Sequence, residues 1–210
     1  GWFQGAMEFG PRALGARSFL ADPRHDTIRD TINAKIKKRE LFRPFAPSVK
    51  EESAAEFFSD SQPSPFMTLA LPVHAHQRDR IPAVTHIDGS ARIQTVRRAE
   101  NPRYWNLLDM FEQRAGVPIL LNTSFNIQEP IVCTPEQALA TFLKSGVDAL
   151  VIGQHRHADP VRGPLGERRP EQLGPDIGGS GDKPAVVVGE LRLVEQLQHH
   201  MHAVGHPQRH

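Results

Sequence analysis

The sequence predicts an α/β protein in which helices pack on a mixed β-sheet. Apolar runs of strand length alternate with amphipathic helical patterns from residue 1 to about residue 157. The alternation lacks the strict strand–helix–strand order of an all-parallel sheet, so we expect a mixed one. From residue 158 the sequence is rich in Pro, Gly and charge. We therefore expect a folded domain over 1–157, a flexible linker over 158–184 and a tail of unknown role over 185–210. The linker and the tail together would form a disordered C-terminal region.

Four helices are predicted from their apolar faces and end signals. A helix over 26–38 has isoleucines at four-residue spacing on one face and Asp26 as its cap. Residues 50–58 form a shorter helix, and we expect its first residue, Lys50, to be exposed. The other two predicted helices span 102–115, after an Asn-Pro start, and 135–145, after a Thr-Pro-Glu-Gln capping box.

Strands are predicted where short apolar runs end at turn residues. These runs cover 65–73, 117–121 and 148–153. Residues 83–96 consist of two β-rich runs on either side of Asp88-Gly89, a pattern that predicts a hairpin. The elements should therefore form one sheet with helices on it.

Composition and charge exclude several classes of protein. The net charge of +1 over 210 residues rules out a polycation that binds nucleic acid by charge alone. No apolar run reaches the length of a membrane span, and the first ten residues lack the pattern of a signal peptide. The single cysteine, Cys133, fits a reducing cytoplasm. The eleven histidines show no zinc-ligand spacing, so we expect no protein-bound metal.

Four stretches carry candidate site residues. They are MEFGPRALGARS with Arg12 (7–18), IKKRELFRPFAPSV with Lys37 and Arg43 (36–49), DGSARIQTV with Arg92 (88–96), and PILLNTSFN with Asn122 and Ser124 (118–126). Each also has an ordinary structural interpretation: a surface turn, a basic helix C-terminus, an exposed hairpin arginine and an Asx turn. Each stretch is therefore a weak signal when taken alone.

Taken together, the four stretches point to phosphate chemistry. The first fifty residues contain ten Lys and Arg against five Asp and Glu, and the cations lie in loops beside buried segments. Small amide and hydroxyl donors accompany them, whereas no nucleophile has a base nearby in the sequence. No GxxxxGK[ST] or GxGxxG loop is present. Phosphoryl and nucleotidyl transfer depend mainly on positioning and charge neutralisation, which such a site supplies.

The same four motifs, in this order, resemble the C-terminal domain of the carbamoyltransferases that modify antibiotics and nodulation factors. The resemblance covers about residues 1–155 and implies a YrdC/Sua5-like fold, a twisted mixed sheet with a basic nucleotide cleft. It implies that the domain uses ATP and carbamoyl phosphate, normally with Mg²⁺, to make carbamoyl-adenylate and pyrophosphate. A Kae1-like domain with an iron site, which normally precedes this one, would then pass the carbamoyl group to a hydroxyl acceptor.

Carried onto this sequence, the resemblance assigns roles to the candidate residues. Arg12, Lys37, Arg43 and Arg92 would be the cations around the phosphate and carbamoyl groups, and Asn122 and Ser124 would be donors to the adenylate. Arg12, Lys37 and Arg43 would serve the catalytic step, with Arg17, Lys38 and Arg39 as supporting cations. The alternative is a fragment that binds nucleotide or RNA, or docks a Kae1-like chain, without turnover. The final acceptor and the oligomeric state are not determined by the sequence.

Overall fold

The computed structural model describes residues 1–153 and 155–158. The linker and tail expected over 158–184 and 185–210 lie outside these residues, apart from position 158. In the described part of the chain, eight strands form a sheet in the order β4-β5-β3-β6-β2-β1-β7-β8. They are β1 (Trp2–Phe3), β2 (Arg17–Ala21), β3 (Ala46–Lys50), β4 (Leu69–Pro72), β5 (Ser90–Val96), β6 (Ile119–Ser124), β7 (Ala149–Ile152) and β8 (His155–Ala158).

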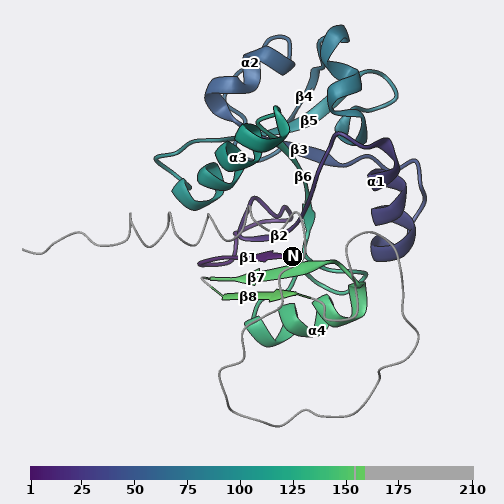
Figure 1. Cartoon of the computed structure of the whole chain (residues 1–210), viewed down its shortest axis with the longest axis vertical. Coiled ribbons are helices and arrows are strands. Elements are labelled where there is room, and N and C mark those ends of the chain that lie inside the picture. Colours follow the sequence, from purple (N-terminus) through teal and green to yellow (C-terminus); the bar gives the residue numbers. More distant parts are fainter. Residues whose placement is uncertain (154, 159–210) are drawn as a thin grey trace, which may run out of the picture.

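The sheet is mixed, which confirms the predicted α/β class. β3 pairs with β5, and β1 with β7, in parallel, whereas the other neighbouring pairs are antiparallel. Figure 1 shows β4, β5 and β3 toward one end of the molecule with α2 and α3, and β1, β7 and β8 toward the other end with α4. The closer similarity to the YrdC/Sua5 fold stays a prediction.

The four predicted helices are confirmed, with local differences. They are α1 (Asp26–Thr31), continued by the π-helix η1 (Ile32–Lys37); α2 (Ala54–Phe57), preceded by the 3₁₀-helix η2 (Glu51–Ser53); α3 (Pro102–Ala115); and α4 (Pro135–Ser145). The side chain of Asn101 caps α3, and Thr134 closes the predicted capping box of α4. Asp26 is the first helical residue rather than the cap, which is His25.

Two strand predictions were wrong in their bounds, and a third was wrong in kind. β4 begins at Leu69 rather than at residue 65, because Met67 adopts a left-handed turn (φ +57°). β6 extends three residues past the predicted end and includes Asn122, Thr123 and Ser124. The predicted hairpin is a turn followed by a single strand, because residues 82–84 form the 3₁₀-helix η4 (Pro82–Val84) and β5 pairs with β4 and β3 instead.

The described residues form two hydrophobic clusters. The larger contains the buried side chains of β3, β5, α2 and α3, among them Tyr104 and Ile93, which are fully buried. The smaller gathers Phe19, Phe125 and Phe142 with residues of β7 and α4. β2 places Phe19 in the smaller cluster, and its next residues, Leu20 and Ala21, pack against the larger one. β6 contributes Ile119, Leu120 and Leu121 to the larger cluster, and Phe125, just after its end, belongs to the smaller one. The chain therefore passes from one cluster to the other at the end of β6.

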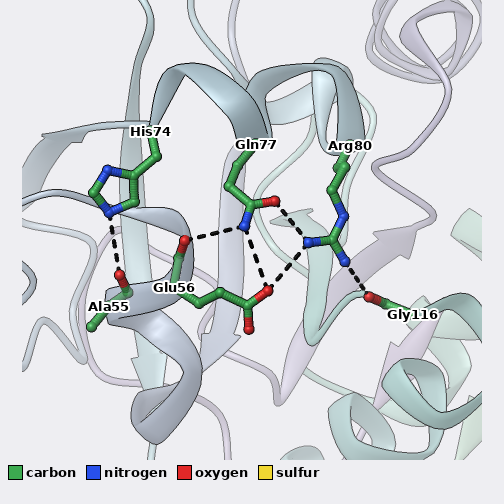
Figure 2. Close-up of polar contacts among 6 residues, drawn as sticks. All are labelled: Ala55, Glu56, His74, Gln77, Arg80 and Gly116. Carbon is green, nitrogen blue, oxygen red and sulfur yellow. Dashed lines mark hydrogen bonds and ion pairs between the residues drawn. The ribbon is translucent and has the colours of Figure 1, made fainter.

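A polar network ties the 3₁₀-helix η3 (Ala75–Arg80) to α2 (Figure 2). Arg80 donates to Oε1 of Glu56 at 3.2 Å, to Oε1 of Gln77 at 2.7 Å and to the Gly116 carbonyl at 2.5 Å. The ring of His74 bonds to the Ala55 carbonyl at 3.2 Å. These partners give His74 a structural role.

Candidate functional site

Lys37, the last residue of η1, is the centre of a buried polar cluster. The side chain is 5% exposed, and its Nζ donates to the backbone carbonyls of Ser124 (2.6 Å) and Asn126 (2.8 Å). It also donates to Oγ of Ser124 (3.1 Å) and Oδ1 of Asn126 (2.8 Å). The Ser124 hydroxyl donates in turn to Oδ1 of Asn126 at 2.6 Å. An ammonium, a hydroxyl and an amide therefore meet where β6 ends.

Phe125 explains how this polar strand end is anchored. Its side chain is fully buried and packs on Phe19, with the ring centroids 4.5 Å apart. Nζ of Lys37 lies 5.5 Å from the centroid of the Phe19 ring. The aromatic residue between Ser124 and Asn126 thus points into the smaller cluster, and its two polar neighbours turn toward Lys37. A bend at Phe125, where the backbone N–H of Asn126 donates to the Ser124 carbonyl at 3.0 Å, produces this arrangement.

Arg39 follows η1 and is held by the fully buried Asn33. Nε of Arg39 donates to Oδ1 of Asn33 at 2.7 Å, and its guanidinium lies over the ring of Phe45 at 4.8 Å. Nδ2 of Asn33 donates to the carbonyls of Leu41 (3.1 Å) and Arg43 (2.9 Å). One buried amide therefore fixes the basic segment that follows the helix. Because Arg39 keeps no carboxylate within ion-pair distance among the described residues, its charge remains available to an anion.

Burial and the charge of Arg39 lower the pKa of Lys37 to about 7, and the carboxylate of Glu129 acts in the opposite direction. Glu129 lies in the loop after Asn126, whose Nδ2 donates to its backbone carbonyl at 2.5 Å. The carboxylate accepts hydrogen bonds from Thr141 (3.0 Å) and from the loop backbone, and these bonds lower the pKa of Glu129. The site thus contains a lysine that titrates near neutrality.

The stability of the fold should rise with pH because of Lys37. Its pKa of about 7 in the folded chain lies below the ordinary value of 10.5, so the unfolded state binds more protons between these two values. The unfolding free energy should therefore rise with pH between about pH 7 and 10.5, by at most about 1.4 kcal/mol per pH unit from this group. Urea unfolding across that range measures the slope. Lys37→Met should remove the contribution, and an identical slope in this variant would contradict the prediction.

Asn122 lies in the interior of the sheet, 2% exposed. Its Nδ2 donates to Oε1 of Gln94 (2.9 Å), to Oγ of Ser48 (3.0 Å) and to the carbonyl of Ala13 (3.2 Å). Ser48 donates to the same oxygen of Gln94 at 2.6 Å. Oδ1 of Asn122 is buried without a hydrogen-bond partner. The side chain therefore joins three strands and supports the 13–15 segment, and its predicted contact with a ligand stays a prediction.

Arg12 and Arg92 form a second pair of positive charges. Arg12 is exposed in the loop before β2, and Arg92 is half-buried on β5 with its Nε lacking a partner. Burial and the nearby charge of Arg12 lower the pKa of Arg92. Neither forms an ion pair with a carboxylate among residues 1–153. Two like charges held together without a counter-charge are a feature of anion sites.

Replacing Arg92 by Ala should weaken ATP binding by about 10- to 150-fold, because a charge-assisted contact to phosphate contributes about 1.5–3 kcal/mol. Isothermal titration calorimetry with MgATP measures the dissociation constant. Arg98→Ala, an exposed arginine two residues past the end of β5, is the matched control and should leave it unchanged. An unaltered dissociation constant in a folded Arg92→Ala chain would remove Arg92 from the site.

The remaining predicted cations differ in their surroundings. Arg43 is exposed, with a 3.8 Å ion pair to Glu40. Arg17 is 4% exposed, donates to the carbonyls of Gln4 (2.9 Å) and Gly5 (3.1 Å), and lies 3.5 Å from the centroid of the Phe3 ring. Arg17 is therefore committed to supporting the loop that carries Arg12.

From the sequence we did not predict that Asn126, a member of the Lys37 cluster, is a site residue, and we predicted Arg39 only as a supporting cation. The signal for Asn126 was the run of small polar residues in NTSFN, which continues past Ser124, and the signal for Arg39 was the crowding of cations after the helix. Lys37 ends a π-helix and Lys38 adopts a left-handed conformation (φ +49°), so the spacing of Lys37 and Arg39 in the sequence did not show how their side chains lie.

A cleft of about 380 Å³ lies next to the segment that follows Arg39. It is lined by Arg29, Phe42, Pro44, Ala83, Thr85, His86, Ile87 and Asp88. The volume falls in the range of small-molecule sites. Burial and the charge of Arg92 lower the pKa of His86, and the charge of Asp88, which also lines the cleft, acts in the opposite direction.

Comparisons with known proteins show the family of the chain. The family described as "Carbamoyltransferase C-terminus" matches residues 1–158. The chain is 57% identical over 159 residues to the nodulation protein NolNO of Sinorhizobium fredii, covering 74% of this chain and 23% of that protein. It is 39% identical over 153 residues to the 3'-hydroxymethylcephem-O-carbamoyltransferase of Amycolatopsis lactamdurans, covering 72% of this chain and 29% of the relative.

A mixed sheet with packed helices defines a protein of the α/β class. More specifically, the chain belongs to the carbamoyltransferase C-terminus family. It spans between about a fifth and a third of the length of these relatives. No helix within the described residues is long and apolar enough to cross a membrane.

Proposed function

We propose that this chain binds ATP and carbamoyl phosphate and forms carbamoyl-adenylate, which a Kae1-like carbamoyltransferase domain uses to carbamoylate a hydroxyl acceptor. The carbamoyl-transfer class follows from the family, and the observation that supports the adenylating step is the site itself. Lys37 and Arg39, with the hydroxyl of Ser124 and the amide of Asn126, form one cationic group, and Arg12 with Arg92 forms another. Each of the two anionic substrates, ATP and carbamoyl phosphate, would therefore have one cationic group to bind.

The chemistry needs charge neutralisation more than a nucleophile. Water splits carbamoyl phosphate into carbamate and phosphate, and a carbamate oxygen then attacks the α-phosphorus of ATP. The bond to the bridging oxygen breaks and pyrophosphate leaves. The cations would neutralise the oxygens around phosphorus, and the amide and hydroxyl of the β6 end would orient the carbamate. Because Asn126 and Ser124 are already positioned by Lys37, little reorganisation is required.

Mg²⁺ would enter with ATP. No group of three or more His, Cys, Asp or Glu side chains among the described residues is arranged to hold a metal. Magnesium usually keeps several waters and binds substrate phosphates, so waters and the phosphates of the nucleotide would supply most of its ligands. The ion adds positive charge on the phosphate oxygens, and Arg12 and Arg92 would bind the oxygens that it leaves free.

Pyrophosphate release that requires both ATP and carbamoyl phosphate tests the proposal. The isolated chain should release pyrophosphate but should not carbamoylate a hydroxyl acceptor, which is assigned to the Kae1-like domain. Carbamoylation by this chain alone would contradict that division of labour. ATP binding with no pyrophosphate from a folded chain would favour the alternative, a fragment that binds nucleotide or docks its partner without turnover. The near-neutral charge argues against RNA as the ligand of that alternative.

A further inference from the structure

The loop that carries Arg12 is folded around one carboxylate oxygen. Oε1 of Glu8 accepts hydrogen bonds from the backbone N–H groups of Leu14 (2.6 Å), Ala16 (2.6 Å) and Arg17 (3.3 Å). These three donors lie six to nine residues after Glu8, so the bonds close residues 8–17 into a compact loop. Backbone groups in such a loop have few other partners, because the loop contains no helix or strand before Arg17.

Buried side chains hold the same segment from the other side. Gln94 donates to the carbonyl of Leu14 at 2.8 Å, and the indole of Trp2 donates to the carbonyl of Gly15 at 2.9 Å. Asn122 donates to the carbonyl of Ala13 at 3.2 Å. The carbonyls of residues 13–15 thus point at side chains of the sheet. The amides of Leu14, Ala16 and Arg17 point at Glu8, and the amide of Gly15 donates to the hydroxyl of Ser18. The segment after Arg12 is fixed on both faces.

The tip of the loop, in contrast, has no packing of its own. Phe9, Gly10, Pro11 and Arg12 are all exposed, and Phe9 is fully exposed. Gly10 adopts φ +126° and has open space around it. The direction in which Arg12 projects is therefore decided by the two ends of the tip, which are Glu8 on one side and Ala13 on the other.

We infer that Glu8 is a positioning residue, whose carboxylate oxygen folds residues 8–17 so that Arg12 projects from a fixed loop to receive an anionic substrate group. The inference rests on the proposed function, since it assigns Arg12 a phosphate or carbamate oxygen as partner. Glu8 itself does not contact substrate. Its effect passes through the backbone of residues 13–17.

The geometry separates a positioning role from a role of the negative charge. All three bonds use Oε1, and Glu8 forms no ion pair within residues 1–153. Gln offers a carbonyl oxygen at the same place without the charge, so Glu8→Gln should keep the loop. Asp is one methylene shorter and cannot bring its oxygen to the three donors without moving the backbone. Ala provides no acceptor.

Two measurements on the wild-type chain and these variants test the inference. Amide hydrogen exchange at Leu14 and Ala16 reports the loop directly, and calorimetry with MgATP and with carbamoyl phosphate reports the anion site. Glu8→Ala and Glu8→Asp should lose protection at both amides and bind at least one anion about tenfold or more weakly, whereas Glu8→Gln should stay within about threefold of wild type. Equal losses in Glu8→Gln and Glu8→Ala would overturn the inference in favour of a role for the charge.

A double-mutant cycle shows whether the effect passes through Arg12. If Glu8 acts by positioning Arg12, adding Glu8→Ala to Arg12→Ala should weaken binding by less than about twofold beyond Arg12→Ala alone. Additive losses would show that Glu8 acts elsewhere and overturn the inference. Wild-type protection at Leu14 and Ala16 in Glu8→Ala would overturn the positioning itself. A wild-type chain that binds neither anion, yet has both amides protected, would instead contradict the proposed function.

Discussion

Replacing Lys37 by Ala is expected to reduce pyrophosphate release by a factor of about 10²–10³, as for the loss of one preorganised electrostatic contact. The reason lies in the number of groups that one ammonium organises. Its three N–H groups are shared among four oxygens, the carbonyl and hydroxyl of Ser124 and the carbonyl and amide oxygen of Asn126. Removing it deletes a positive charge and releases both polar side chains at the same time. A coupled assay of pyrophosphate with saturating ATP and carbamoyl phosphate measures the loss.

Lys35 supplies the control, because it lies on the same π-helix and is exposed. Lys35→Ala should release pyrophosphate at the wild-type rate. Lys50, expected from the sequence to be an exposed helix start, is unsuitable: it is the last residue of β3, 7% exposed and ion-paired to Asp109 at 2.8 Å and to Glu112. Wild-type activity in a folded Lys37→Ala chain would move the site away from the end of β6.

Replacing Gly15 by Ala is expected to destabilise the fold by about 3–5 kcal/mol, combining backbone strain with overpacking. Gly15 adopts φ +104°, a conformation that residues with a β-carbon rarely take. A β-carbon there would also overlap the ring of Tyr104, which is fully buried beneath the loop. Neither the ring nor the loop can retreat, since Trp2 and Ser18 bond to the backbone of Gly15. Urea or thermal unfolding measures the change.

Gly10→Ala separates the two contributions. Gly10 also has positive φ, at +126°, but a β-carbon there would meet open space. This variant should lose only the backbone part, about 1–2 kcal/mol. If Gly15→Ala cost no more than Gly10→Ala, the close approach of the loop to Tyr104 would be absent in solution.

The elements that the sequence predicted correctly are those whose signals are local. The helix over 102–115 has a capping Asn101, a proline in its first turn and Gly116 in the left-handed conformation at its end. The capping box at Thr134 predicted the start of α4 for the same reason. Each signal involves residues within one turn of each other, so no tertiary contact is needed to interpret it.

The elements that it missed depend on partners far along the chain. β2 lies between β1 and β6, and only pairing with Thr123 and its neighbours makes residues 17–21 a strand. The predicted hairpin is absent because β5 pairs with β3 and β4, and not with residues 83–87 that precede the turn. Strand propensity reflects packing and pairing in the sheet, which the sequence around a single run does not contain.

The candidate site also has features that depend on the local sequence and features that depend on tertiary contacts. The sequence by itself predicted phosphate chemistry, because excess cations, small polar donors and no nucleophile–base pair are properties of composition and spacing. Only the tertiary structure decided which side chains meet. Lys37 lies 87 residues before Ser124, and Asn122 lies 109 residues after Ala13, yet both pairs are within hydrogen-bond distance. Burial made Lys37 a group that titrates near neutrality and turned Asn122 inward, because the free energy of a polar group depends on the neighbours that folding places around it.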